Sequence, residues 1–183
     1  YNQSNGTRIW NFSQSAITRG RGISIDSSLN VYAVGTKSSD ISIIKYNSAG
    51  SELWNKSFNG GFVDRGEEVA VDFNSSAYIS AYSEDGPLVS YSTILKYNSS
   101  GNLTWNITFD YDYTDSSSFE DYIFDIEVDN NDSVYVTGYL DDGAASSGDT
   151  ITLFLIKLNA TNGNHLWNVT FNTSKNNYGY AVG

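Results

Sequence analysis

Side chains able to do chemistry are scarce in this chain, apart from the acidic ones. Its 183 residues include no Cys, no Met and one His, and 21 Asp+Glu against 10 Lys+Arg give a net charge of −11. Without Cys, the chain has no disulfide, thiolate ligand or thiol nucleophile. His165 falls in a predicted turn, far from the oriented setting that an imidazole needs in a metal site or a Ser–His–Asp triad. We therefore expect a protein that is not an enzyme and has no catalytic or cofactor-binding residues.

Two acidic loops carry the ligand types that calcium prefers, the second containing Asp141, Asp142 and Asp149. In the first loop, Asp110 and Asp112 are followed by Asp115, and Ca²⁺ takes six to eight oxygen ligands, largely from carboxylates and carbonyls. The spacing resembles the start of an EF-hand loop, although Asp115 stands where that loop requires glycine. A calcium site and a solvated acidic loop both remain open, and no other metal or cofactor is predicted.

Asn-x-Ser/Thr triplets are unusually frequent. They begin at 12 of the 20 Asn residues, namely Asn2, Asn5, Asn11, Asn55, Asn74, Asn98, Asn102, Asn106, Asn131, Asn159, Asn168 and Asn172. Such triplets are acceptors for N-linked glycans on secreted proteins. They predict a glycosylated protein, extracellular or on the cell surface. The alternative is that Asn and Thr only fill the polar faces of strands and turns.

The elements that would position these residues form a repeat. Each Trp follows a Gly by four residues and precedes an Asn, and the four positions are Trp10, Trp54, Trp105 and Trp167. Successive Trp residues are 44, 51 and 62 residues apart, and a repeat of this length is typical of propellers and solenoids. A Trp could stack on a sugar, but its fixed place in the repeat favours a structural core between neighbouring units.

Each unit reads as four short strands. A first strand ends in Asp26, Asp72 or Asp129, where the carboxylate is expected to cap the following turn. A Val-Tyr-like strand, a strand with a Lys-Tyr-Asn or Lys-Leu-Asn run, and the Trp strand follow. No segment shows a helical period, so the chain is predicted to be all-β. Three complete units are expected at about 20–58, 66–109 and 122–171.

These motifs resemble the bacterial and archaeal repeat family that forms seven-bladed β-propellers. The resemblance rests on 60–72, which begins Gly-Gly and ends in Asp, on 96–105 and on 129–138, and it weakens at Ala81 and Tyr82. It implies a β-propeller of four-stranded antiparallel blades in a surface protein. It implies no catalytic residues.

The two ends of the chain match different parts of the unit. Residues 1–13 match the third and fourth strands, and residues 177–183 match the first. The prediction is a single propeller or propeller fragment over 1–183, with three complete blades and one incomplete blade split between 1–13 and 177–183. It could be part of a longer propeller, be completed by a neighbouring copy, or close as a small four-bladed form.

Charge and loop lengths narrow the function. An acidic surface repels nucleic acid and anionic lipid, and no apolar run is long enough to insert into a membrane. The longest insertions fall in two connections that share one face, which makes that face the candidate for binding. We expect a non-enzymatic structural or adhesive protein that associates with itself or with other surface proteins, as in a surface layer or a filament joined through terminal strands. The alternative is a carbohydrate-binding or carbohydrate-degrading propeller.

Overall fold

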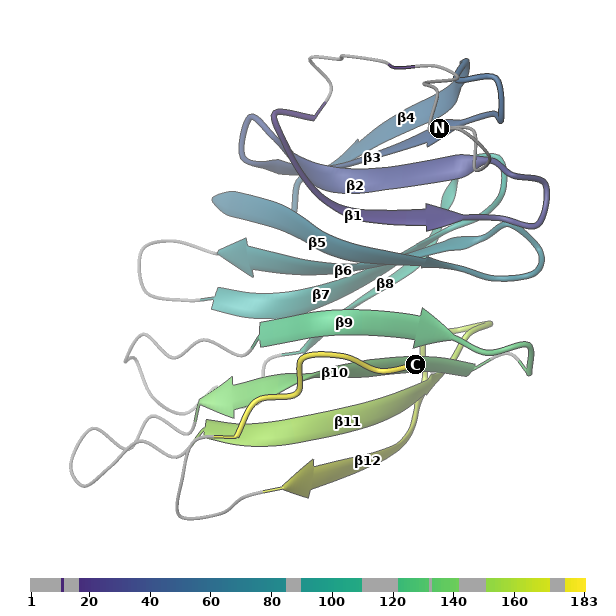
Figure 1. The fold of residues 1–183 in the computed structure, drawn as a ribbon. Coiled ribbons are helices and arrows are strands. Elements are labelled where there is room, and N and C mark those ends of the chain that lie inside the picture. Colours follow the sequence, from purple (N-terminus) through teal and green to yellow (C-terminus); the bar gives the residue numbers. More distant parts are fainter. Residues whose placement is uncertain are drawn as a thin grey trace, which may run out of the picture.

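The computed structural model is all-β, with twelve strands in three four-stranded antiparallel sheets (Figure 1). It describes residues 11, 17–84, 90–109, 122–131, 133–141, 151–171 and 177–183. The residues in these ranges form no helix, and so none that could cross a membrane. The prediction of an all-β chain of antiparallel four-stranded units is confirmed at this level.

Each sheet is a meander in which strands consecutive in sequence pair with one another. The first sheet contains β1 (Arg19–Ile25), β2 (Val31–Lys37), β3 (Asp40–Tyr46) and β4 (Glu52–Phe58). The second contains β5 (Val63–Val71), β6 (Ala77–Glu84), β7 (Ser90–Tyr97) and β8 (Leu103–Phe109). The third contains β9 (Tyr122–Val128), β10 (Ser133–Asp141), β11 (Ile151–Asn159) and β12 (His165–Phe171). The expected units at 20–58, 66–109 and 122–171 thus fall on one sheet each.

The core lies between the sheets. Successive side chains of a strand point to opposite faces, so Ile79 of β6 packs toward the first sheet with Val34, whereas Tyr78 packs toward the third with Val136. All four side chains are completely buried. The second sheet therefore has both faces covered, and the first and third sheets each bury one of their own faces against it.

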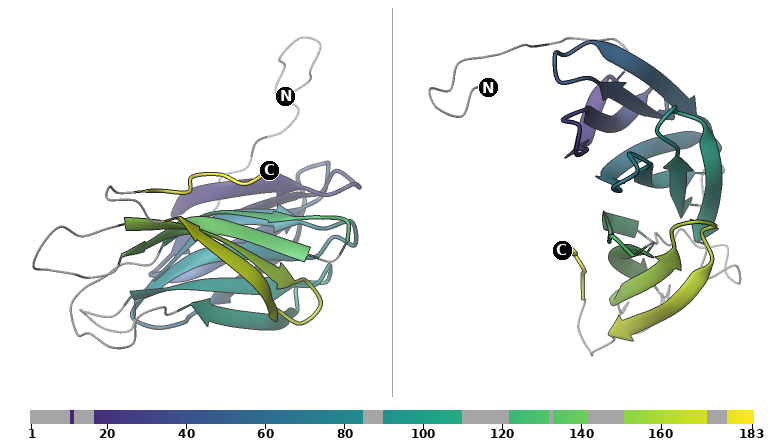
Figure 2. Two further views of the ribbon diagram at one scale, coloured as in Figure 1. Left: turned by 90° about the horizontal axis from the view of Figure 1, so that it is seen from below. Right: turned by 90° about the vertical axis from the view of Figure 1, so that its right-hand side faces the viewer.

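The three sheets follow one another around an arc (Figure 2). The first strands β1, β5 and β9 lie toward its inner side, and the last strands β4, β8 and β12 lie toward its outer side. β5 contacts β1, and β9 contacts β5. The turn from β2 to β3 and the entry to β5 lie at the left-hand end of Figure 1, where β6 ends and β7 begins. The two kinds of connection therefore share one end of the sheets, as expected.

Residues 177–183 lie beyond the third sheet, along the ends of β9 and β10. The Gly179 N–H donates to Gly138 O at 3.2 Å, and the Val182 N–H donates to Asp125 Oδ2 at 2.7 Å. Gly66 of β5 approaches Gly35 of the first sheet in the same way. The segment therefore lies against β9 and β10, and it belongs to none of the three sheets. The other half of the predicted split unit, 1–13, lies outside the described residues apart from Asn11.

Candidate functional site

Four side chains recur in each sheet as one cluster, which we call the Asp–Tyr–Lys–Trp cluster. Its members are Asp26, Tyr32, Lys45 and Trp54 in the first sheet, Asp72, Tyr78, Lys96 and Trp105 in the second, and Asp129, Tyr135, Lys157 and Trp167 in the third. The Tyr hydroxyl donates to the Asp carboxylate at 3.2, 3.0 and 3.1 Å in the three sheets. The Lys Nζ lies 4.8–5.0 Å from the centre of the Tyr ring. These contacts join the end of the first strand of each sheet to its second and third strands.

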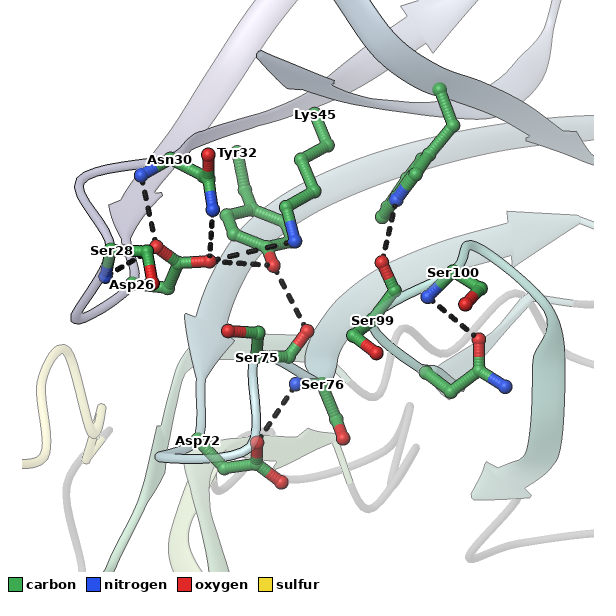
Figure 3. Close-up of polar contacts among 12 residues, drawn as sticks. Asp26, Ser28, Asn30, Tyr32, Lys45, Asp72, Ser75, Ser76, Ser99 and Ser100 are labelled. Atoms are coloured by element: carbon green, nitrogen blue, oxygen red, sulfur yellow. Dashed lines mark hydrogen bonds and ion pairs between the residues drawn. The ribbon is translucent and has the colours of Figure 1, made fainter. Parts of the chain in front are cut away.

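The Asp of the cluster fixes the turn between the first two strands. Asp26 Oδ1 accepts the N–H groups of Ser28 and Asn30 at 3.0 and 2.9 Å (Figure 3). Its other oxygen faces Lys45 Nζ at 3.5 Å. Burial alone would raise the pKa of Asp26, but hydrogen bonds from Asn30 and Ser75, with the charge of Lys45, lower it to about 2. The carboxylate is thus ionised and fully engaged in structure, and the predicted turn-capping role is confirmed.

The Trp of one sheet is covered by the turn before the last strand of the next sheet. Trp54 Nε1 donates to Ser99 O at 3.0 Å, and Trp105 Nε1 donates to Ala160 O at 3.1 Å. A glycine of positive φ sits over each ring, Gly101 over Trp54 and Gly163 over Trp105. A Cβ there would come within 2.9 Å and 3.1 Å of the ring atoms, so the turn needs glycine for both its conformation and its close approach.

No described residue covers the strip that Trp167, Val169 and Phe171 form on β12, at the outer side of the third sheet. These side chains are 40%, 42% and 57% exposed. Their equivalents on β8 are Trp105, Ile107 and Phe109, which are partly buried against the core of the next sheet. The two strands have the same pattern of residues, and they differ in having or lacking a neighbouring sheet among the described residues.

On the opposite face of the first sheet, Ile44 and Tyr46 of β3 are buried with Ile17 packed against them, whereas β1 is exposed there. Ile23 and Ile25 of β1 are 68% and 59% exposed. The equivalents of Ile23 on β5 and β9 are 4% and 2% exposed because the preceding sheet covers them, and those of Ile25 are half-buried; they are Val69 and Ile126, and Val71 and Val128. The described array therefore ends in two different apolar surfaces, each of which is matched by a covered surface in the interior. The exposure of these two apolar surfaces was not predicted from the sequence, although alignment of the repeats shows apolar residues at the same positions in every unit.

The Asn-x-Ser/Thr triplets (sequons) of the last strands lie on the side of the strand opposite its Trp. In β4 and β8, Trp alternates with an exposed Asn and an exposed hydroxyl residue two positions later, as at Asn55 and Ser57, and Asn106 and Thr108. The other exposed sequon residues are Asn11, Asn74, Asn102, Asn131 and Asn168. Asn98 and Asn159 are half-buried, and their side-chain oxygens accept turn N–H groups. Occupancy by glycans stays a prediction.

Several predicted residues lie outside the described parts of the chain. They are Trp10, the sequon residues Asn2, Asn5 and Asn172, and the calcium candidates Asp110, Asp112, Asp115, Asp142 and Asp149. Within the described parts, no three His, Asp or Glu side chains are arranged to hold a metal ion. His165 is exposed at the start of β12, with Nε2 3.1 Å from Asn168 Oδ1.

Comparison with known proteins identifies no family for this chain. No family model matches the chain, and no curated protein matches it. Among solved structures, it is similar to three variants of the Synechocystis apocarotenoid oxygenase, with TM-scores of 0.46, 0.48 and 0.48 and 10% identity. The match covers 85% of this chain, which spans only 38% of the length of those proteins.

The expectation that the chain is not an enzyme is corrected on this finding, because the structures it resembles are those of an enzyme. At 10% identity and these TM-scores, the likeness transfers neither an activity nor a site to this chain.

Proposed function

We propose that this chain is a β-propeller-type repeat module with a structural or adhesive role at the cell surface, and that copies of it join head to tail. The observation that carries the proposal is the apolar strip of β12 on the outer face of the last sheet, where Trp167 is 40% exposed. At the equivalent position of the second sheet, Trp105 donates to the following sheet and packs under Gly163. Monomeric proteins seldom leave such a contiguous apolar surface uncovered without a partner.

The occupant proposed for this face is a second copy of the chain. The same interface already occurs twice in the described array, between its first and second and between its second and third sheets. Residues 177–183 of the first copy already lie against β9 and β10 on this face, so a second copy would extend the series by covering β12. A head-to-tail contact of this kind does not close on itself unless the rotation forms a ring, so it generates filaments or rings.

Residues 177–183 support the proposal from the other side. They lie against β10 and β9 through Gly179 and Val182, where the proposal puts the first strand of the split blade. Residues 1–13 repeat the sequence of the third and fourth strands. The predicted split blade would accordingly draw on two copies, in the manner by which propellers remove open strand edges.

Glycans at the last strands are compatible with this arrangement. Asn55 and Asn106 are exposed and point away from the Trp on the same strand. Sugars on them would lie on the side of the strand that no neighbouring sheet covers. The proposed protein is therefore extracellular and N-glycosylated.

Sedimentation velocity on the 183-residue chain from a host without N-glycosylation tests this assembly. The wild-type chain is expected to form concentration-dependent oligomers, and Trp167→Arg is expected to remain monomeric. The matched control is Asn168→Arg, which adds the same charge to the next residue of β12, on its opposite and exposed face. The proposal fails if the wild-type chain stays monomeric throughout the concentration series, or if both variants lower association equally.

A further inference from the structure

A pocket of about 340 Å³ lies between the first two sheets, at the end that carries the variable connections. Its lining comes from the entry to β1, the turn between β2 and β3, and the start of β5, and consists of Thr18, Arg19, Thr36, Ser38, Ser39 and Val63, with Arg65. This end lies at the left of Figure 1. The volume is near the lower limit of small-molecule pockets, which span roughly 300–1,000 Å³.

Two arginines line this pocket, although the whole chain has only 10 Lys+Arg and a net charge of −11. Arg19 is exposed and forms no ion pair with the described residues. Arg65 Nη2 is 3.5 Å from Glu84 Oε1, and this long ion pair is the one that Arg65 makes with the described residues. The Arg65 guanidinium also lies 5.2 Å from the centre of the Tyr82 ring, which holds it in place.

Hydroxyl groups form much of the remaining wall. Thr36 Oγ1 is buried and has no hydrogen-bond partner among the described residues. Ser38 and Ser39 adopt left-handed backbone conformations, with φ of 50° and 71°. The turn is held in this conformation because Ser39 O accepts the N–H of Asp64 at 2.6 Å. Positive φ at both positions is typical of the two-residue type I′ turn that joins β2 to β3, and it fixes where the two hydroxyl-bearing residues lie.

We propose that this pocket binds an acidic sugar, with its carboxylate on Arg19 and Arg65 and its ring hydroxyls on Thr36, Ser38 and Ser39. The planar guanidinium fork matches a carboxylate in both geometry and charge. The several hydroxyl donors exceed what a compact inorganic anion would use, and the described lining contains no aromatic ring for a nucleobase. This site goes beyond the assembly proposed above and does not depend on it, since it lies within one copy between the first two sheets.

Calorimetric titration of the chain, produced without glycans, tests the site with glucuronate, glucose and inorganic sulfate. Glucuronate is expected to bind more tightly than either control ligand. Arg19→Gln is expected to weaken glucuronate binding at least about tenfold, because it removes a charge-assisted hydrogen bond. The charge-matched control is Lys37→Gln, an exposed residue near the same turn that does not line the pocket, and it is expected to leave glucuronate affinity within about twofold.

A second variant separates binding from folding. Thr36→Val removes the unpartnered buried hydroxyl without loss of volume, so it is expected to keep or raise the melting temperature while weakening glucuronate binding. The proposal is overturned if glucuronate does not bind, if sulfate binds as tightly as glucuronate, or if Lys37→Gln weakens binding as much as Arg19→Gln does. Failure of oligomer formation alone would leave this site standing.

Discussion

At the scale of single residues, the Asp of the repeated cluster shows how a short polar motif fixes a strand end. Asp26 has no exposed side-chain surface, and its oxygens meet two backbone N–H groups, Tyr32 and Lys45. A buried carboxylate is tolerated only when its hydrogen bonds are complete, and this one is paired with a buried ammonium. Asp72 and Asp129 likewise each accept a Tyr hydroxyl and at least one backbone N–H of the turn, so the motif is structural in all three sheets.

Asp26→Asn is expected to lower the free energy of unfolding at pH 7 by about 1–3 kcal/mol, because it leaves Lys45 without its charge partner. The pKa of Asp26 is about 2 in the folded chain, below its ordinary 3.8. The stabilising effect of the ionised form is therefore present above about pH 4 and is lost as the pH falls through 2. Urea unfolding from pH 7 to pH 2 should show the variant and the wild type converging. A constant difference over that range would contradict this role.

Glu68 on β5 is the opposite case. Burial raises its pKa above the ordinary value of 4.5, and the nearby carboxylates Asp125 and Glu127 raise it further. A raised pKa means that the protonated form favours the fold, and that this contribution is lost as the pH rises through the folded pKa. Glu68→Gln is expected to increase the melting temperature at pH 8 and to have little effect at pH 4. Equal effects at both pH values would show that its charge is not the cause.

At the scale of elements, the last strand of each sheet acts as a joint between sheets. β4 and β8 have the same alternation of half-buried and exposed residues, whereas every residue of β12 is exposed. The sequence of β12 preserves the Trp and the apolar residues that β8 buries, so its exposure results from the lack of a described neighbour. The sequence of β12 is therefore that of a strand whose apolar side is covered by a neighbouring sheet.

Trp105→Ala and Trp167→Ala form a matched pair for this idea. Trp105 packs under the next sheet, so its removal is expected to cost about 2–4 kcal/mol, near the lower range for large-to-small core changes. Trp167→Ala is expected to cost about 1 kcal/mol or less in the dilute monomer, because 40% of the side chain is exposed. Denaturant unfolding at low protein concentration measures both. Equal losses would mean that Trp167 is already buried in the monomer.

The sequence predicted the strands well because each carries a local signal. Alternation, the terminal Asp and the glycine before each Trp all act within a few residues, and the structure places them in matching positions in every sheet. The candidate sites were less predictable. Arg19 and Arg65 come from different sheets, and the left-handed conformation of Ser38 and Ser39 has no glycine to announce it. The exposure of Trp167, unlike that of Trp105, depends on stacking between sheets rather than on its own strand.

At the scale of the whole molecule, charge opposes the assembly that the apolar faces favour. Each copy carries a net charge of −11, so two copies repel one another over a Debye length of about 8 Å at physiological salt. Assembly is therefore expected to strengthen between about 50 mM and 1 M NaCl as the repulsion is screened, while the buried apolar contact is retained. Light scattering at fixed protein concentration checks this, and weaker association at high salt would point to an electrostatic interface instead.

Oxidative footprinting of the tryptophans tests head-to-tail assembly most directly. The chain is exposed to hydroxyl radicals at increasing protein concentration, and mass spectrometry measures the modification of each ring. Trp54 and Trp105, half-buried under neighbouring sheets, should be modified less than Trp167 in the monomer and to the same extent at every concentration. Trp167 should be modified in the monomer and become protected as oligomers form. Continued modification of Trp167 in the oligomer would contradict the account, because the uncovered face of β12 would then not be the surface that joins the copies.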